Sequence, residues 1–71
     1  MNELRLREVL GTLTHNRPLA SWSEVTQYTR FDTQPLDGRA VARWLRRRGF
    51  VRRVDTSWDL TTAGWNWLRG E

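Results

Sequence analysis

The chain has 71 residues, and its 12 basic side chains, all of them arginine, give a formal net charge of +4. With 38% apolar and 28% charged residues, residues 1–71 are predicted to form one domain with a small core, not a disordered or membrane protein. The absence of cysteine and the single histidine exclude a disulfide and an ordinary zinc site. The charged N-terminus is unlike a signal peptide, so we expect a cytoplasmic protein. We also expect no cofactor.

An amphipathic helix is predicted over residues 2–14, with Asn2 as its N-cap. The apolar side chains that mark one face of this helix are Leu6, Val9, Leu10 and Leu13. Because proline cannot continue a helix, the segment His15-Asn16-Arg17-Pro18 is expected to break it. Leu19 and Ala20 then form a short extended piece.

The sequence Ser21-Trp22-Ser23-Glu24 predicts the start of a second helix. It matches the S-x-x-E capping box, in which two side chains satisfy backbone amides reciprocally. Val25 and Tyr28 are spaced to face the core. The helix is expected to end near Thr29, and residues 30–36 are predicted to connect it to the next helix.

The third helix, residues 37–48, has the clearest pattern. Asp37 is a good N-cap, and Gly49 is a good C-terminal stop. The residues expected to face the core are Val41, Trp44 and Leu45. The residues on the opposite face of the helix are Arg39, Arg43, Arg46 and Arg47.

A β-hairpin is predicted over residues 50–60, because the apolar period changes to two after the third helix. Residues 55–57 are expected to form its three-residue turn. Thr61 or Thr62 can cap a short last helix. The residues expected to face inward from that helix are Trp65 and Leu68.

The five tryptophans divide by their positions in these predicted elements. The tryptophans expected in the core are Trp44, Trp58 and Trp65. Trp22 and Trp67 lie off the inward faces and are candidate interface residues, since exposed tryptophan is favoured at binding surfaces. Trp67 could join the first helix in a homodimer contact, or it could pack against Leu4 or Leu6 and close the core between the termini.

The placement of the arginines is more informative than their number. Codon bias in a GC-rich genome can explain why arginine replaces lysine, but it does not explain where the arginines lie. Residues 38–54 contain seven arginines and no acidic residue, a charge of +7, whereas the rest of the chain carries −3. A basic patch on a mildly acidic body favours polyanionic partners.

Two stretches of the sequence carry a resemblance to a known family. In Leu45-Arg46-Arg47-Arg48-Gly49-Phe50-Val51-Arg52-Arg53, a helix ends in Leu-x-x-x-Gly and a large apolar residue, Val and basic residues follow. In Trp58-Asp59-Leu60-Thr61-Thr62-Ala63-Gly64-Trp65, the pattern is aromatic-x-Leu-Thr-x-x-Gly. Both resemble winged helix-turn-helix DNA-binding domains of small bacterial or phage-type regulators. The resemblance implies an α+β, mainly α fold with three helices, a short β-hairpin wing and a short C-terminal helix.

The resemblance also implies a function, namely double-stranded DNA binding in transcription regulation or DNA architecture. The helix over residues 37–48 would lie in the major groove, with the hairpin over residues 50–60 as the wing. Two features depart from the family pattern. The connection over residues 30–36 is longer than the 3–4-residue turn of a tight helix-turn-helix, and the turn of the wing is short.

The third helix supplies four candidate DNA contacts. Arg39 and Arg43 lie one turn apart and are the first choice for base edges, because a guanidinium group can pair bidentately with guanine. Arg46 and Arg47 lie nearer the C-terminus and are candidate phosphate contacts. In the alternative interpretation, the arginines near the end of the helix only complement its dipole and solvate its surface.

Four further residues are candidate DNA contacts outside this helix. Arg52 and Arg53 lie on the wing strand and could meet the DNA backbone or the minor groove. Strand alternation puts them on opposite faces, so one of the two is expected to be less available. Ser21 and Ser23, with the amides at the start of the second helix, could bind a phosphate or could simply cap the helix.

The sequence also bears on functions other than DNA binding. We expect no enzyme, because the sequence has no cysteine nucleophile, no lysine base and no glycine-rich phosphate loop. The main alternative is a winged-helix protein-interaction module, such as a phage- or plasmid-type adaptor or inhibitor. Its partner would be a polymerase or a replication or recombination protein.

Overall fold

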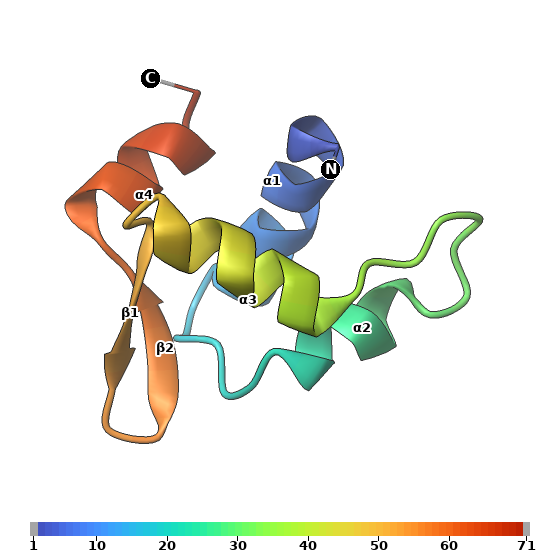
Figure 1. The fold of residues 1–71 in the computed structure, drawn as a ribbon, viewed down its shortest axis with the longest axis horizontal. Coiled ribbons are helices and arrows are strands. Elements are labelled where there is room, and N and C mark those ends of the chain that lie inside the picture. Colours follow the sequence, from blue (N-terminus) through green and yellow to red (C-terminus); the bar gives the residue numbers. More distant parts are fainter. Residues whose placement is uncertain (1, 71) are drawn as a thin grey trace.

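The computed structural model describes residues 2–70. In this range it contains four helices and one two-stranded antiparallel hairpin (Figure 1). In chain order the elements are α1 (Glu3–Leu13), α2 (Ser23–Thr29), α3 (Gly38–Arg47), β1 (Val51–Val54), β2 (Ser57–Leu60) and α4 (Thr62–Leu68). About half of the chain is helical, and the predicted α+β class is confirmed. None of the described helices has the length and apolar character needed to cross a membrane.

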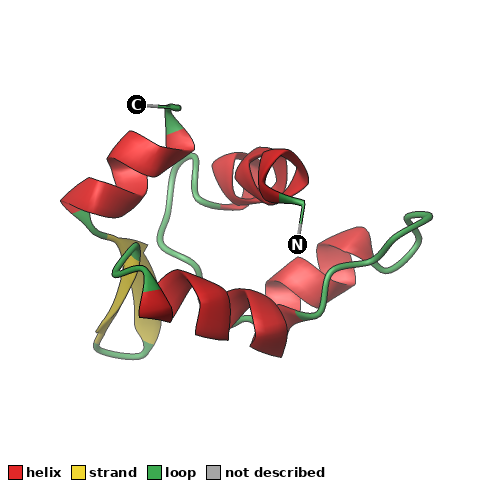
Figure 2. Cartoon of the chain, turned by 45° about the horizontal axis from the view of Figure 1, so that its top comes forward, coloured by secondary structure: helices red, strands yellow, loops and turns green. Residues whose placement is uncertain are grey.

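The helices surround a core to which each of them contributes. The buried cluster consists of Leu6, Val9, Leu10, Leu19, Val25, Val41, Leu45 and Trp67. Figure 2 shows α3 and the hairpin together along one side of the molecule, with α1 and α4 along the other. The connection between α2 and α3 projects from the end opposite the hairpin (Figures 1 and 2).

The first helix and the extended piece after it are as predicted. Asn2 caps α1, because its Oδ1 accepts a hydrogen bond from the N–H of Arg5 at 3.2 Å. Of the four apolar residues predicted for its inward face, Leu13 is half-buried and the others are buried. After α1, the N–H groups of Leu19 and Trp58 each donate to the other's carbonyl, at 2.9 and 2.8 Å. The extended piece therefore attaches to the outer edge of β2.

A close approach at Gly38 fixes α3 against α2. A Cβ at this position would lie 2.2 Å from the carbonyl oxygen of Trp22, so only glycine fits without a shift of the backbone. The N–H of Gly38 donates to Thr26 Oγ1 at 2.8 Å, and the N–H of Leu36 donates to Thr29 Oγ1 at 2.9 Å. These contacts anchor the connection between α2 and α3 and set the orientation of α3. The sequence alone leaves that orientation open, because the connection is long.

The prediction that Tyr28 faces the core is wrong. Its side chain is 51% exposed, and Thr29 is fully buried in its place. The Thr29 hydroxyl donates to the carbonyl of Val25 at 2.9 Å and accepts from the connection that follows α2. A threonine can be buried here because both its donor and its acceptor are satisfied.

The inward face of α4 also differs from the prediction. Trp65 is 36% exposed, whereas Trp67 is only 7% exposed. The rotation of the helix is set by Gly64, where a Cβ would lie 2.0 Å from the carbonyl oxygen of Phe50. Because residues three and four positions later share a helix face, Trp67 and Leu68 turn inward with Gly64.

The hairpin has a shorter turn than predicted. β1 and β2 pair antiparallel with Val54 opposite Ser57, so residues 55–56 form a two-residue turn instead of the predicted three. Asp55 has a φ of 55°, the left-handed conformation that aspartate tolerates better than most residues. After the hairpin, the side chain of Thr61 caps α4.

Candidate nucleic-acid interface

The predicted arginine face of α3 is present in the structure. Asp37 begins the helix by accepting a hydrogen bond from a first-turn N–H at 3.0 Å, and Gly49, with a φ of 71°, ends it. Val41 and Leu45 are fully buried. The arginines predicted to face away from them, all exposed, are Arg39, Arg43, Arg46 and Arg47.

One of the two hairpin arginines, Arg53, extends this surface onto β1. Both Arg52 and Arg53 are exposed, and the ladder places them on opposite faces of the hairpin as expected, Arg53 on the side of Trp58 and Arg52 on the side of Asp59. They differ in their neighbours: Arg52 lies opposite Asp59 in the ladder, and Arg53 Nε donates to the carbonyl of Asp55 at 3.2 Å. We define the basic face as the side chains of Arg39, Arg43, Arg46, Arg47 and Arg53. Arg52 lies on the other side of the hairpin, in a hollow with Asp59 and Trp65.

Three of the arginines within residues 38–54 lie near tryptophan rings. The guanidinium carbons of Arg46 and Arg53 lie 5.4 and 5.8 Å from the ring centroid of Trp58. The guanidinium carbon of Arg48 lies 4.4 Å from the ring centroid of Trp44. These distances are within the range of cation–π attraction, about 6 Å, so part of the positive charge is held in place by aromatic side chains.

The other arginines of the basic face have no such contact. Within residues 2–70, no side-chain hydrogen bond, ion pair or ring contact engages the guanidinium groups of Arg39, Arg43 and Arg47. The ion pairs of the described residues lie elsewhere, between Arg5 and Asp32 and between Arg17 and Glu24. The basic face is therefore left without a direct acidic partner.

The start of α2 is occupied by a carboxylate. Glu24 accepts hydrogen bonds from the N–H groups of Ala20 at 2.8 Å and Ser21 at 3.4 Å, which is the glutamate half of the predicted capping box. A hydrogen bond from Arg17 lowers the pKa of this carboxyl group. The hydroxyl groups of Ser21 and Ser23 bond to each other at 2.7 Å, and the helix begins at Ser23. Because a carboxylate already takes these amides, we leave both serines out of the proposed interface.

The two candidate interface tryptophans are placed differently. The Trp67 ring lies 5.1 Å from Phe50 and 5.6 Å from Trp44 between centroids, and it belongs to the core cluster with Leu6. Its burial contradicts a role as an exposed dimer contact and confirms the alternative in which it closes the core. Trp22 is half-buried, with its ring 5.4 Å from that of Trp58, and its interface role stays a prediction.

The surface of α3 is shallowly hollowed between its arginines. One hollow of about 470 Å³ is lined by Arg43, Arg46 and Arg47, and one of about 230 Å³ is lined by Ala40, Arg43, Trp44 and Arg47. Guanidinium groups line both, so they suit an anionic group better than a neutral ligand. No group of three metal-ligating side chains occurs among residues 2–70.

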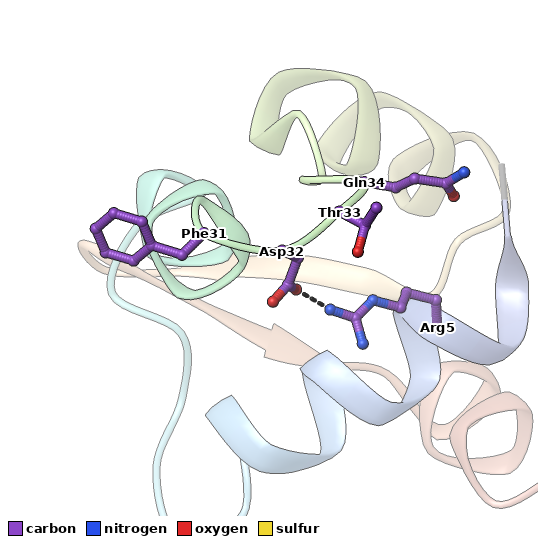
Figure 3. A pocket seen from close by; sticks show the side chains of 5 residues that line it. All are labelled: Arg5, Phe31, Asp32, Thr33 and Gln34. Carbon is purple, nitrogen blue, oxygen red and sulfur yellow. Dashed lines mark hydrogen bonds and ion pairs between the residues drawn. The ribbon is translucent and has the colours of Figure 1, made fainter.

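A further hollow of about 480 Å³ lies between α1 and the connection after α2 (Figure 3). Its lining includes the ion pair of Arg5 and Asp32, and Figure 3 shows the ring of Phe31 pointing away from this pair. Phe31 is 87% exposed, and Tyr28 on the preceding turn is also exposed. Neither aromatic residue was predicted to be exposed, because helix spacing assigned Tyr28 to the core and a connection has no periodic pattern.

Comparisons of the chain with protein-family models, with curated proteins and with solved structures give no match. The function must therefore be inferred from the arrangement of the side chains themselves.

Proposed function

We propose that this protein binds double-stranded DNA, with α3 in the major groove and the β1–β2 hairpin as a wing. The observation that carries this proposal is the basic face, which gathers five of the seven arginines of an acid-free segment on one helix and the adjoining strand. An α-helix fits the major groove, and a surface of one sign attracts a polyanion and speeds its encounter. Transcription regulation or an architectural role on DNA would use such a surface.

The order of the elements supports a winged helix-turn-helix type of fold. Three helices, a hairpin and a short last helix follow one another as the sequence resemblance implies. The hairpin lies beside α3 (Figure 2), where it could reach the DNA next to the groove that the helix enters. The long connection between α2 and α3 points away from the hairpin, so it does not lie between α3 and the hairpin.

Within the basic face we assign different roles to different arginines. Arg39 and Arg43 lie in the first half of α3 without contacts to other side chains, and they are the candidates for reading base edges. Arg46 and Arg47 lie at the end of the helix and are candidates for phosphate contacts. Arg53, on the hairpin, would follow the DNA backbone or the minor groove.

The proposal is tested by measuring binding to random duplex DNA over a series of salt concentrations. If the arginines neutralise phosphates, log K should fall linearly with log salt, with a slope of about −0.9 for each phosphate contacted. Four to six contacts would give a slope of roughly −4 to −5. Absence of binding even at low salt would refute the proposal.

The second candidate function is a protein-interaction module of the adaptor type. The observation that favours it is the pair of exposed aromatic residues at the other end of the molecule, Phe31 and Tyr28. Isolated exposed apolar side chains are common in soluble proteins, so this observation is weaker than the basic face. A protein that fails to bind DNA at low salt would turn attention to this surface.

A further inference from the structure

We infer that Trp58 is a positioning residue for the basic face. Its indole ring holds the guanidinium groups of Arg46 and Arg53 in place before any DNA is bound. This inference rests on the proposed function and specifies how the binding surface is organised.

The ring of Trp58 is a meeting point for side chains from different elements. Arg46 approaches it from α3 at 5.4 Å, and Arg53 approaches it from β1 at 5.8 Å, measured to the ring centroid. Arg53 is the direct cross-strand partner of Trp58, whereas Arg46 reaches the ring from the end of the helix. A single side chain thus connects the charge on the helix with the charge on the hairpin.

Trp58 is itself well anchored. Its backbone exchanges two hydrogen bonds with Leu19, at 2.8 and 2.9 Å, and its ring lies 5.4 Å from that of Trp22. Trp22 is in turn held where its carbonyl meets Gly38 at the start of α3. The ring therefore has a fixed place relative to α3, and it can impose order on the longer and more flexible arginine side chains.

Cation–π attraction to an indole leaves an arginine able to bind phosphate. The guanidinium group carries several N–H donors, and those that point away from the ring remain available for oxygen atoms. A side chain that is ordered before binding loses less conformational entropy when the complex forms. For two arginines, we expect this ordering to strengthen DNA binding by about tenfold.

Arg47 provides a matched control on the same helix. It is exposed like Arg46 and lies next to it in the sequence, but no ring contact engages its guanidinium group among the described residues. If Trp58 acts by positioning, changes at Trp58 should alter the contribution of Arg46 and Arg53 and leave that of Arg47 unchanged.

The test on DNA is a set of double-mutant cycles built on Trp58→Leu, which keeps apolar bulk but removes the aromatic ring. We expect Trp58→Leu to weaken binding to random duplex DNA by about tenfold with little change in the salt slope, and Trp58→Phe to restore most of the loss. Arg46→Gln and Arg53→Gln should weaken binding less in the Trp58→Leu background than in the wild type, whereas Arg47→Gln should have the same effect in both. Equal effects of Arg46→Gln in the two backgrounds would overturn the inference.

A second measurement reads the positioning without DNA. In NMR spectra of the free wild-type protein, the side-chain protons of Arg46 and Arg53 should show ring-current shifts that depend on Trp58. Any shift of the Arg47 protons would come from Trp44, which lines the same hollow, and should be unchanged in the Trp58 variants. Trp58→Leu should abolish the Arg46 and Arg53 shifts if it folds; Trp58→Phe should reduce them. Unshifted Arg46 and Arg53 protons in the wild-type spectrum would overturn the inference by themselves. Failure to bind DNA would refute the proposed function. The ring-current shifts of the free protein would still test the positioning role of Trp58 separately.

Discussion

The two ends of the molecule treat their charged side chains differently. Around α1, α2 and the connection after α2, two arginines pair with acids, Arg5 with Asp32 and Arg17 with Glu24, while Arg7 and Arg30 lie near the rings of Trp67 and Phe31; we refer to this as the paired region. On the basic face the arginines lie against tryptophan or have no partner among the described side chains. The net charge of +4 therefore describes neither region, because among the described residues ion pairs to acids occur in the paired region and not on the basic face.

The ion pairs of the paired region join different segments of the chain. Arg5 ties α1 to the connection through Asp32, 27 residues away, and Arg17 ties the segment after α1 to α2 through Glu24. Exposed ion pairs contribute at most about 1 kcal/mol, so their main effect is to place these segments. Unpaired like charges on the basic face repel one another and cost some stability, a cost that an anionic partner would relieve.

The largest effect is expected from disrupting the close contact between α2 and α3 at Gly38, which connects the paired region to the basic face. Gly38→Ala would push a Cβ against the carbonyl oxygen of Trp22, and we expect a loss of about 3 kcal/mol in the free energy of unfolding, since backbone must move. Gly11→Ala is the matched control, because nothing lies within 4 Å of a Cβ there; it should stabilise α1 by about 1 kcal/mol. Urea unfolding followed by circular dichroism measures both, and equal stabilities of the two variants would contradict the close approach.

Within the basic face, Arg43→Ala should affect sequence discrimination. If Arg43 reads guanine, its loss should reduce the preference for one base pair by about 1–3 kcal/mol in binding free energy. Arg47→Ala should instead weaken binding to all sequences alike and lower the salt slope by about 1. Competition between a selected site and its single-base variants separates the two. Uniform weakening by Arg43→Ala would reduce Arg43 to a phosphate contact.

The smallest effect is expected in the paired region and depends on pH. Hydrogen bonding to Arg17 lowers the pKa of Glu24 in the folded protein, so its contribution to stability is present at neutral pH. That contribution should be lost as the pH falls from about 4.3, the ordinary glutamate value, through the lower pKa of the folded state. Glu24→Gln should therefore cost less than about 1 kcal/mol at pH 7 and progressively less in acid. Thermal unfolding of both proteins across this range measures the difference, and a gap that widens in acid would have the wrong sign.

Much of the fold and of the candidate interface could be predicted from local patterns. The spacing of Val41 and Leu45 identifies the buried side of α3, and the arginines opposite follow from the same period. Asp37 and Gly49 mark the ends of that helix by general capping chemistry. These features depend on residues within a few positions of one another, which is why the sequence reveals them.

The rest depends on contacts between distant segments. Thr29 replaces Tyr28 in the core because its hydroxyl binds the connection, and Trp67 replaces Trp65 because Gly64 must meet the backbone of Phe50. The spacing from Gly64 to Trp67 was a usable signal, since glycine in a helix often marks a close approach. No local pattern indicates that Arg46 shares the ring of Trp58 with Arg53, because that contact joins a helix to a hairpin.

The most direct measurement of the central claim is an NMR titration of the isotope-labelled protein with a random DNA duplex at low salt. The proposal predicts that amide and arginine side-chain shifts concentrate in residues 38–54 and that the paired region, with Tyr28 and Phe31, changes little. Shifts confined to the paired region, or no shifts at all at low salt, would contradict the assignment of the basic face as the DNA-binding surface.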